Sequence, residues 1–166
     1  MGPDHAAALV GPCLTLIARD EPAFAIRRES SRWIDELLAA YPQKGGVIIV
    51  VQANVAPPSE EGRDHIDRSY AEYSRGVVAG AMVIEGEGFV SASIRSVVSR
   101  LMLRSKYNYP IKAFAHVTEG AAFLASSLPE ASRASASFIT SGVEELRAAY
   151  EGEYGRFTAG SPSVSL

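Results

Sequence analysis

The sequence VIIVV at Val47–Val51 is an unbroken apolar run, and two similar runs follow it. They are VVAGAMVI at Val77–Ile84 and IKAFAHV at Ile111–Val117. A run without polar interruption, such as Val47–Val51, is typical of a strand that is covered on both faces. Each run is followed by a capping or glycine signal and then by helical spacing. This alternation predicts an α/β fold in which helices cover a parallel sheet.

In the segments that follow these runs, the apolar residues have the spacing of amphipathic helices. Ser59–Gly76 is a polar helix with Ser59 as its N-cap. Thr118 caps a helix of small residues that runs through Leu128 and ends before a proline. The helix after Gly88 has the widest apolar face, which is typical of a helix that covers a sheet. That face comprises Ile94, Val97, Val98, Leu101 and Met102.

Two shorter segments before the first run predict another pair of strands. Pro12–Ala18 and Ala23–Arg28 are joined by a tight polar turn at Arg19–Pro22. Because this turn is too short for a crossover helix, we expect the two strands to be antiparallel neighbours. A helix over Ser30–Tyr41 follows, with serines at its start and acidic residues in its first turn.

The sequence thus predicts a mixed, mostly parallel sheet of about five strands covered by helices. The expected order is two strands, then helix and strand in alternation up to a fourth helix. This domain spans residues 12–128. Residues 129–157 are expected to form a linker and an extra C-terminal helix, and residues 1–11 and 158–166 are expected to be flexible tails.

The extra C-terminal helix carries an apolar stripe of Val143, Leu146 and Tyr150, and Ser141 with Glu144 forms a capping box at its start. Such a stripe has to pack against something, because a short helix is not stable alone. The alternatives are its own domain, a second copy or a partner. Tyr150 is a candidate partner contact, since aromatic residues are enriched in interfaces.

Composition excludes several classes of protein. The 166 residues include 16 basic and 19 acidic side chains, a net charge of −3 without the basic patch of a nucleic-acid-binding protein. Cys13 is the single cysteine and is expected to be a small buried hydrophobe. No apolar stretch is long enough for a transmembrane helix, and the N-terminus does not resemble a secretory signal. We expect a cytoplasmic protein of bacterial type.

The order of elements resembles the STAS-like domains, the group that includes bacterial anti-anti-sigma factors, and in particular their divergent small bacterial relatives. The stretch IKAFAHVTEGAAFLASSL at Ile111–Leu128 carries the resemblance, which covers residues 12–128. It implies regulation through protein contacts. The serine that matches the family's phosphorylation switch is Ser59. The Asp-Ser-Ser-Gly motif is absent there, and Glu60 and Glu61 would repel a phosphate, so a plain N-cap is the alternative role.

Four polar residues are expected at the carboxyl edge of the sheet, where parallel sheets bind ligands: Asn54, Glu85, Glu87 and His116. A glutamate and a histidine within hydrogen-bond reach would suit general acid–base chemistry. Polar residues are also normal in such loops, where a glutamate offsets a helix dipole. The histidines lie on separate elements without ligand spacing, so no metal site or cofactor is predicted.

No pattern in the chain predicts catalytic residues. The sequence favours a non-enzymatic protein-interaction or regulatory module that binds a protein partner or self-associates. Its contact surface would be the C-terminal helix or the helix face that carries Arg95. The alternative is a small-molecule-binding or enzymatic site at the carboxyl edge of the sheet.

Overall fold

The computed structural model describes residues 1–2, 5–19, 22–52, 60–86, 92–93, 95–96, 98–99 and 108–155. It is an α/β structure with one five-stranded sheet, as predicted. The strands lie in chain order; the first pair is antiparallel and the other three pairs are parallel. The strands are β1 (His5–Val10), β2 (Cys13–Ala18), β3 (Gly45–Val51), β4 (Val77–Ile84) and β5 (Ile111–Phe114).

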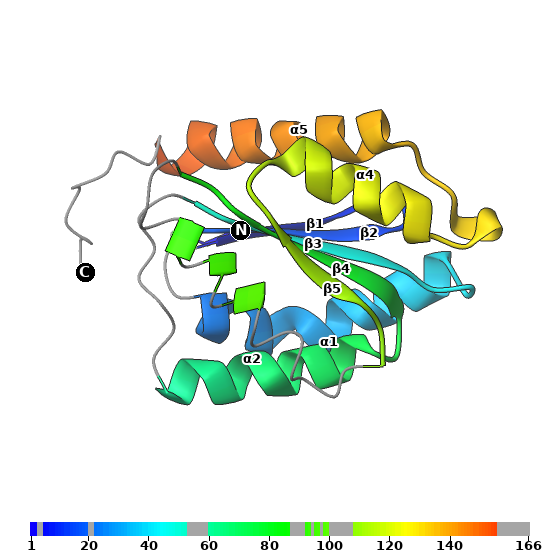
Figure 1. The fold of residues 1–166 in the computed structure, drawn as a ribbon, viewed down its shortest axis with the longest axis horizontal. Helices are drawn as coiled ribbons and strands as arrows, with labels where there is room; N and C mark the ends of the chain where they lie inside the picture. The colour runs from blue at the N-terminus through cyan, green and yellow to red at the C-terminus, as the bar shows by residue number, and fades with distance from the viewer. Residues whose placement is uncertain are drawn as a thin grey trace.

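Helices cover both faces of the sheet (Figure 1). They are α1 (Pro22–Ala40), α2 (Glu60–Tyr73), α4 (Val117–Ser127) and α5 (Ala136–Tyr154), with a 3-10 turn at Glu130–Ser132. Because the strands follow chain order and crossovers are right-handed, α1 and α2 fall on the same face. The helices after the last strand, α4 and α5, cover the other face. Between β4 and β5, residues 92–93, 95–96 and 98–99 are helical.

The core consists of two apolar layers, one on each side of the sheet. Alternate residues of β3 show the division: Val47 and Ile49 face α1 and α2, whereas Ile48 and Val50 face α4 and α5. This is the alternation of a strand that is buried on both sides. The predictions of β3, β4 and β5 are confirmed, although β5 ends at Phe114, before the predicted Val117.

The predicted first strand pair was wrong. The partner of β2 is β1, which lies within residues 1–11, the expected flexible arm. The segment Ala23–Arg28 is part of α1. A two-residue turn joins β1 to β2, and its Gly11 has a φ of +53°, which suits a glycine followed by the fixed φ of a proline. Pro22 is the first residue of α1, where a proline lacks no helical hydrogen bond.

The start of α5 also differs from the prediction. Its N-cap is Ser135, whose hydroxyl accepts a hydrogen bond from the Phe138 N–H at 3.1 Å. Ser141 therefore lies inside the helix, and the predicted capping box was wrong. Similarly, α4 begins at Val117 and its N-cap is His116, so the prediction of Thr118 as the cap was wrong.

The apolar stripe of α5 packs on its own domain. Ile139, Val143 and Tyr150 are buried in the same layer as α4 and the sheet residue Ile48. Of the three alternatives that the sequence left open for this stripe, packing on its own domain is the one observed.

Candidate functional site

The carboxyl edge of the sheet brings together part of the predicted site. Glu85 follows β4 directly, and His116 follows β5. The described residues also place Arg19 and Gln52 there, after β2 and β3. Asn54, Glu87 and the candidate phosphorylation residue Ser59 lie outside the described residues.

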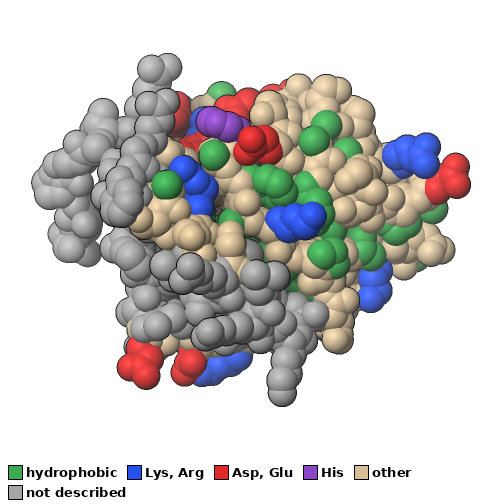
Figure 2. Space-filling view, in the orientation of Figure 1, with side chains coloured by type: hydrophobic (Ala, Val, Ile, Leu, Met, Phe, Trp, Pro, Cys, Tyr) green, Lys and Arg blue, Asp and Glu red, His purple; other side chains and the backbone are tan. Residues whose placement is uncertain are grey.

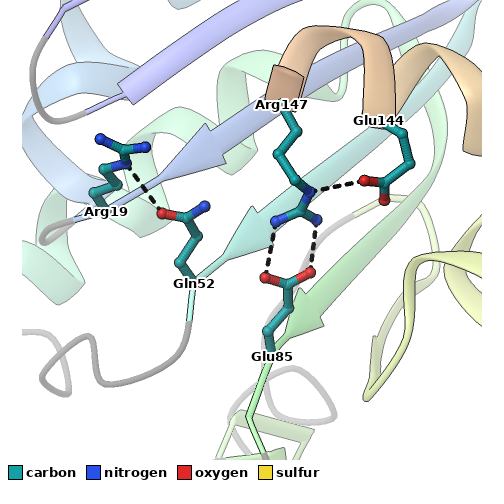
Figure 3. A network of polar contacts seen from close by, with 5 residues as sticks. All are labelled: Arg19, Gln52, Glu85, Glu144 and Arg147. Atoms are coloured by element: carbon teal, nitrogen blue, oxygen red, sulfur yellow. Dashed lines mark hydrogen bonds and ion pairs between the residues drawn. The ribbon is translucent and has the colours of Figure 1, made fainter. Parts of the chain in front are cut away.

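Glu85 is bound by an arginine that the sequence did not single out. Its two carboxylate oxygens accept hydrogen bonds from Arg147 of α5 at 2.6 and 3.0 Å (Figure 3). The Nε of Arg147 also donates to Glu144 at 2.9 Å. The side chains of Arg147 and Glu85 are 16 % and 27 % exposed. Burial alone would lower the pKa of Arg147, but the bonds and charges of Glu85 and Glu144 outweigh it and raise that pKa.

Arg19 holds the C-terminal end of α5. Its guanidinium lies 4.2 Å from the centroid of the Tyr150 ring, and it donates to the main-chain carbonyls of Tyr154 and Gly155. Its Nε donates to the side chain of the buried Gln52 at 3.2 Å (Figure 3). An arginine that satisfies the last carbonyls of a helix stabilises that helix end.

Arg95 also bonds to the main chain. It donates to the carbonyls of Ile84 and Gly86 at 2.9 and 3.2 Å, and it is half-buried. The structure therefore places its guanidinium against the end of β4. Tyr150 is fully buried, so it contacts α5's own domain; it could reach a partner only if α5 left the sheet.

His116 is exposed, and its side chain forms no capping hydrogen bond with α4. Among the described residues it has no hydrogen bond or ion pair with Glu85, whose carboxylate is bonded to Arg147. Glu87, the other glutamate predicted beside His116, lies outside the described residues. Within the described part of the chain, no three histidine, cysteine or acidic side chains form a group that could hold a metal ion.

A groove lies along β1, the edge strand at the other edge of the sheet from β5. It encloses about 380 Å³ between this edge strand and α5. Phe138 at one end of the groove is 51 % exposed and packs over Gly11. The lining is mostly apolar, with one carboxylate, and comprises Ala8, Leu9, Val10, Gly11, Phe138, Ser141, Gly142, Glu145 and Leu146.

The main chain of β1 is open along this groove. Gly2 and His5 exchange main-chain hydrogen bonds at 2.9 and 3.3 Å, so the N–H and C=O of His5 point away from β2. Alternate residues of a strand direct these groups to the same side. Those of Ala7 and Leu9 therefore point outward as well, and beyond Gly2 no described segment pairs with this side of β1.

The other edge of the sheet is protected. β5 has four residues, follows Pro110, and carries the exposed Lys112. Short edge strands, prolines and lysines are the usual devices against strand pairing. Figure 2 shows this side of the molecule, where basic side chains lie among the green apolar ones. β1, HAAALV, is longer and carries no lysine or proline.

Comparison with protein-family models, with curated proteins and with solved structures found no match. In the described residues, no helix has the length and apolar character needed to span a membrane. Neither Arg147 nor the β1 groove was predicted from the sequence. An apolar strand next to a Gly-Pro turn was the one local signal for β1.

Proposed function

We propose that this protein is a non-enzymatic protein-interaction module whose contact surface is the β1 edge with its groove. The open main chain of Ala7 and Leu9 carries this proposal. An exposed strand edge binds another extended segment through main-chain hydrogen bonds, and adjacent apolar pockets take its side chains. The groove between β1 and α5 is such a pocket.

The difference between the two edges supports the same function. An unprotected edge strand is an aggregation hazard, so proteins normally blunt it. Here β5 is short and bears Lys112, whereas β1 is apolar and accessible. The absence of such protection on β1 is explained if another chain binds to this edge.

The resemblance to STAS-like domains agrees with this proposal, since it implies regulation through protein contacts. The arginines at the carboxyl edge of the sheet stabilise the fold and, within the described residues, do not form a ligand site. Arg19, Arg95 and Arg147 each bond to a main-chain carbonyl or a carboxylate within the fold.

Site-specific photo-cross-linking in the natural host tests the proposal. A photoreactive amino acid replaces Ser141, which is exposed in the groove, or Ser126, which is exposed on α4, away from the groove-lining residues. Light-dependent protein adducts are expected at position 141 and not at position 126. Equal labelling at both positions, or no adduct at position 141, would contradict the proposal.

A further inference from the structure

We infer that the partner of the β1 groove is a single extended segment of another protein, which pairs with β1 and directs a lysine or arginine to Glu145. This inference rests on the proposed function, because it names the chemistry of the partner at the same surface. Three features of the described residues define that partner: the space beside β1, the two ends of the groove and the charge of α5.

The space beside β1 admits a strand that carries no helix above it. A Cβ at Gly142 would lie 2.1 Å from Val10, so α5 lies directly over β1. Paired strands are about 4.8 Å apart, whereas packed helices need about 8–10 Å between their axes. A helix above the added strand would therefore collide with α5. A second copy paired through β1 would bring such a helix, so the partner that fits is a separate extended segment.

The N-terminal residues indicate the direction of this segment. Gly2 pairs antiparallel with His5 on the outer side of β1, so that side accepts an antiparallel strand. A segment in the same direction runs from Gly11 toward Gly2 and ends before it. Its main chain bonds to the open groups of Ala7 and Leu9, the two residues that lie between those limits and point outward.

The two ends of the groove take different side chains. Phe138, 51 % exposed over Gly11, offers an apolar contact at one end. Glu145 lies seven residues further along α5, which is about 10 Å at 1.5 Å per residue. Alternate residues of a strand are about 6.7 Å apart, and a lysine or arginine side chain spans the remainder. Because the antiparallel segment runs in the same direction as α5, its apolar residue comes first and its basic residue two positions later.

The charge of α5 favours a basic residue in the segment. The helix carries four glutamates and one arginine. That arginine, Arg147, is already bonded to Glu85 and Glu144. The exposed Glu145 has no hydrogen bond or ion pair with any other described residue. A lysine or arginine would pair with Glu145, whereas an acidic segment would be repelled by the helix.

Selection from a phage-displayed library of random seven-residue peptides, against the purified full chain, tests the inference. The wild type is expected to enrich peptides in which an apolar residue is followed two positions later by lysine or arginine. Glu145→Lys is expected to enrich an acidic residue at that position instead. The control Glu130→Lys changes an exposed glutamate outside the groove lining and should keep the basic preference. Circular dichroism verifies that each variant is folded.

The best peptide selected on the wild type, made synthetically, tests the charge and the main-chain pairing separately. Its affinity should fall several-fold on Glu145→Lys and recover when its basic residue is changed to glutamate. When it binds the wild type, the amides of Ala7 and Leu9 should become protected from hydrogen exchange. Those of Ala6 and Ala8, which point toward β2, should be protected throughout.

Three results would overturn the inference: no enrichment of basic residues, a basic preference that Glu145→Lys retains, or a bound peptide that leaves Ala7 and Leu9 exchanging freely. Protection of these two amides without any peptide would also overturn it, because this chain itself would then occupy the edge. If cross-linked adducts form at position 141 but the selected peptides show no basic preference, this inference fails and the proposed function stands. If no adduct forms there, the proposed function itself fails.

Discussion

Glu85 and Arg147 are 62 residues apart in the chain and meet in a two-pronged ion pair. The pair joins the carboxyl end of β4 to α5, on the face opposite α1 and α2. The bond to Glu144, which lies on α5 itself, orients the guanidinium, and the two bonds to Glu85 hold α5 above the end of β4. The groove beside β1 depends on that position, since α5 forms one of its walls.

Replacement of Arg147 by methionine is expected to lower the free energy of unfolding by about 1–3 kcal/mol, between the values of exposed and buried ion pairs. It leaves Glu85 half-buried without its partner. The matched control is Arg75→Met, which removes an ion pair with Asp35 whose side chains are 53 % and 62 % exposed. That change should cost less than about 1 kcal/mol. Urea unfolding measures both, and equal costs would contradict the role of the Glu85 pair.

Gly142 and Gly152 in α5 provide a matched pair of alanine substitutions. An alanine Cβ at Gly142 would lie 2.1 Å from Val10, whereas at Gly152 nothing lies within 4 Å. Gly142→Ala should destabilise the fold by about 1–3 kcal/mol through overpacking. Gly152→Ala should stabilise it by up to about 1 kcal/mol, because alanine is the better helix former. Thermal unfolding measures both, and a stabilising Gly142→Ala would show that α5 does not lie tightly on β1.

The inner strands β3 and β4 were predictable because strands that are buried on both faces have continuous apolar runs in the local sequence. The bounds of β4 agree with its apolar run, Val77–Ile84. The start of β3 was missed because Gly45 has no side chain to contribute to an apolar pattern. A Cβ at Gly45 would lie 1.9 Å from the carbonyl oxygen of Pro12, so a close main-chain approach requires glycine there.

The edge strand β1 and the polar network around Glu85 could not be predicted from the sequence, for two different reasons. β1 is rich in alanine, which is depleted in strands, so its pattern resembled a flexible arm. The partner of Glu85 could not be found from spacing, because it depends on how α5 packs across the sheet. Glu85 itself was placed correctly at the carboxyl edge, since that position follows from the strand order alone.

Cys13 is expected to be unreactive in the folded protein. It is fully buried, and burial raises the pKa of its thiol from 9.0 to about 12. Only the thiolate is nucleophilic, so a thiol reagent at pH 8 should modify the native chain far more slowly than the chain unfolded in urea. Fast modification without denaturant would contradict the buried position.

The same shift has a consequence for alkaline stability. The folded state holds the Cys13 proton more tightly than the unfolded state. Below pH 9.0 the thiol is protonated in both states, so the difference in pKa does not change the free energy of unfolding. Between pH 9.0 and about 12 the unfolded state loses this proton first, so the free energy of unfolding falls as pH rises. Cys13→Ala should therefore flatten the decline of stability between these values, as measured by urea unfolding at several pH values. An unchanged decline would assign it to other groups.

Arg19→Met is expected to loosen the end of α5. The change removes the contact with the Tyr150 ring and the hydrogen bonds to the carbonyls of Tyr154 and Gly155. Amide exchange in the last turn of α5 should become several-fold faster, while the amides of β3 keep their protection because the sheet does not depend on this contact. The control is Arg32→Met, which removes an arginine that lies over Trp33 at 4.9 Å on α1. Unchanged protection at the end of α5 would mean that the apolar packing of Tyr150 suffices to hold it.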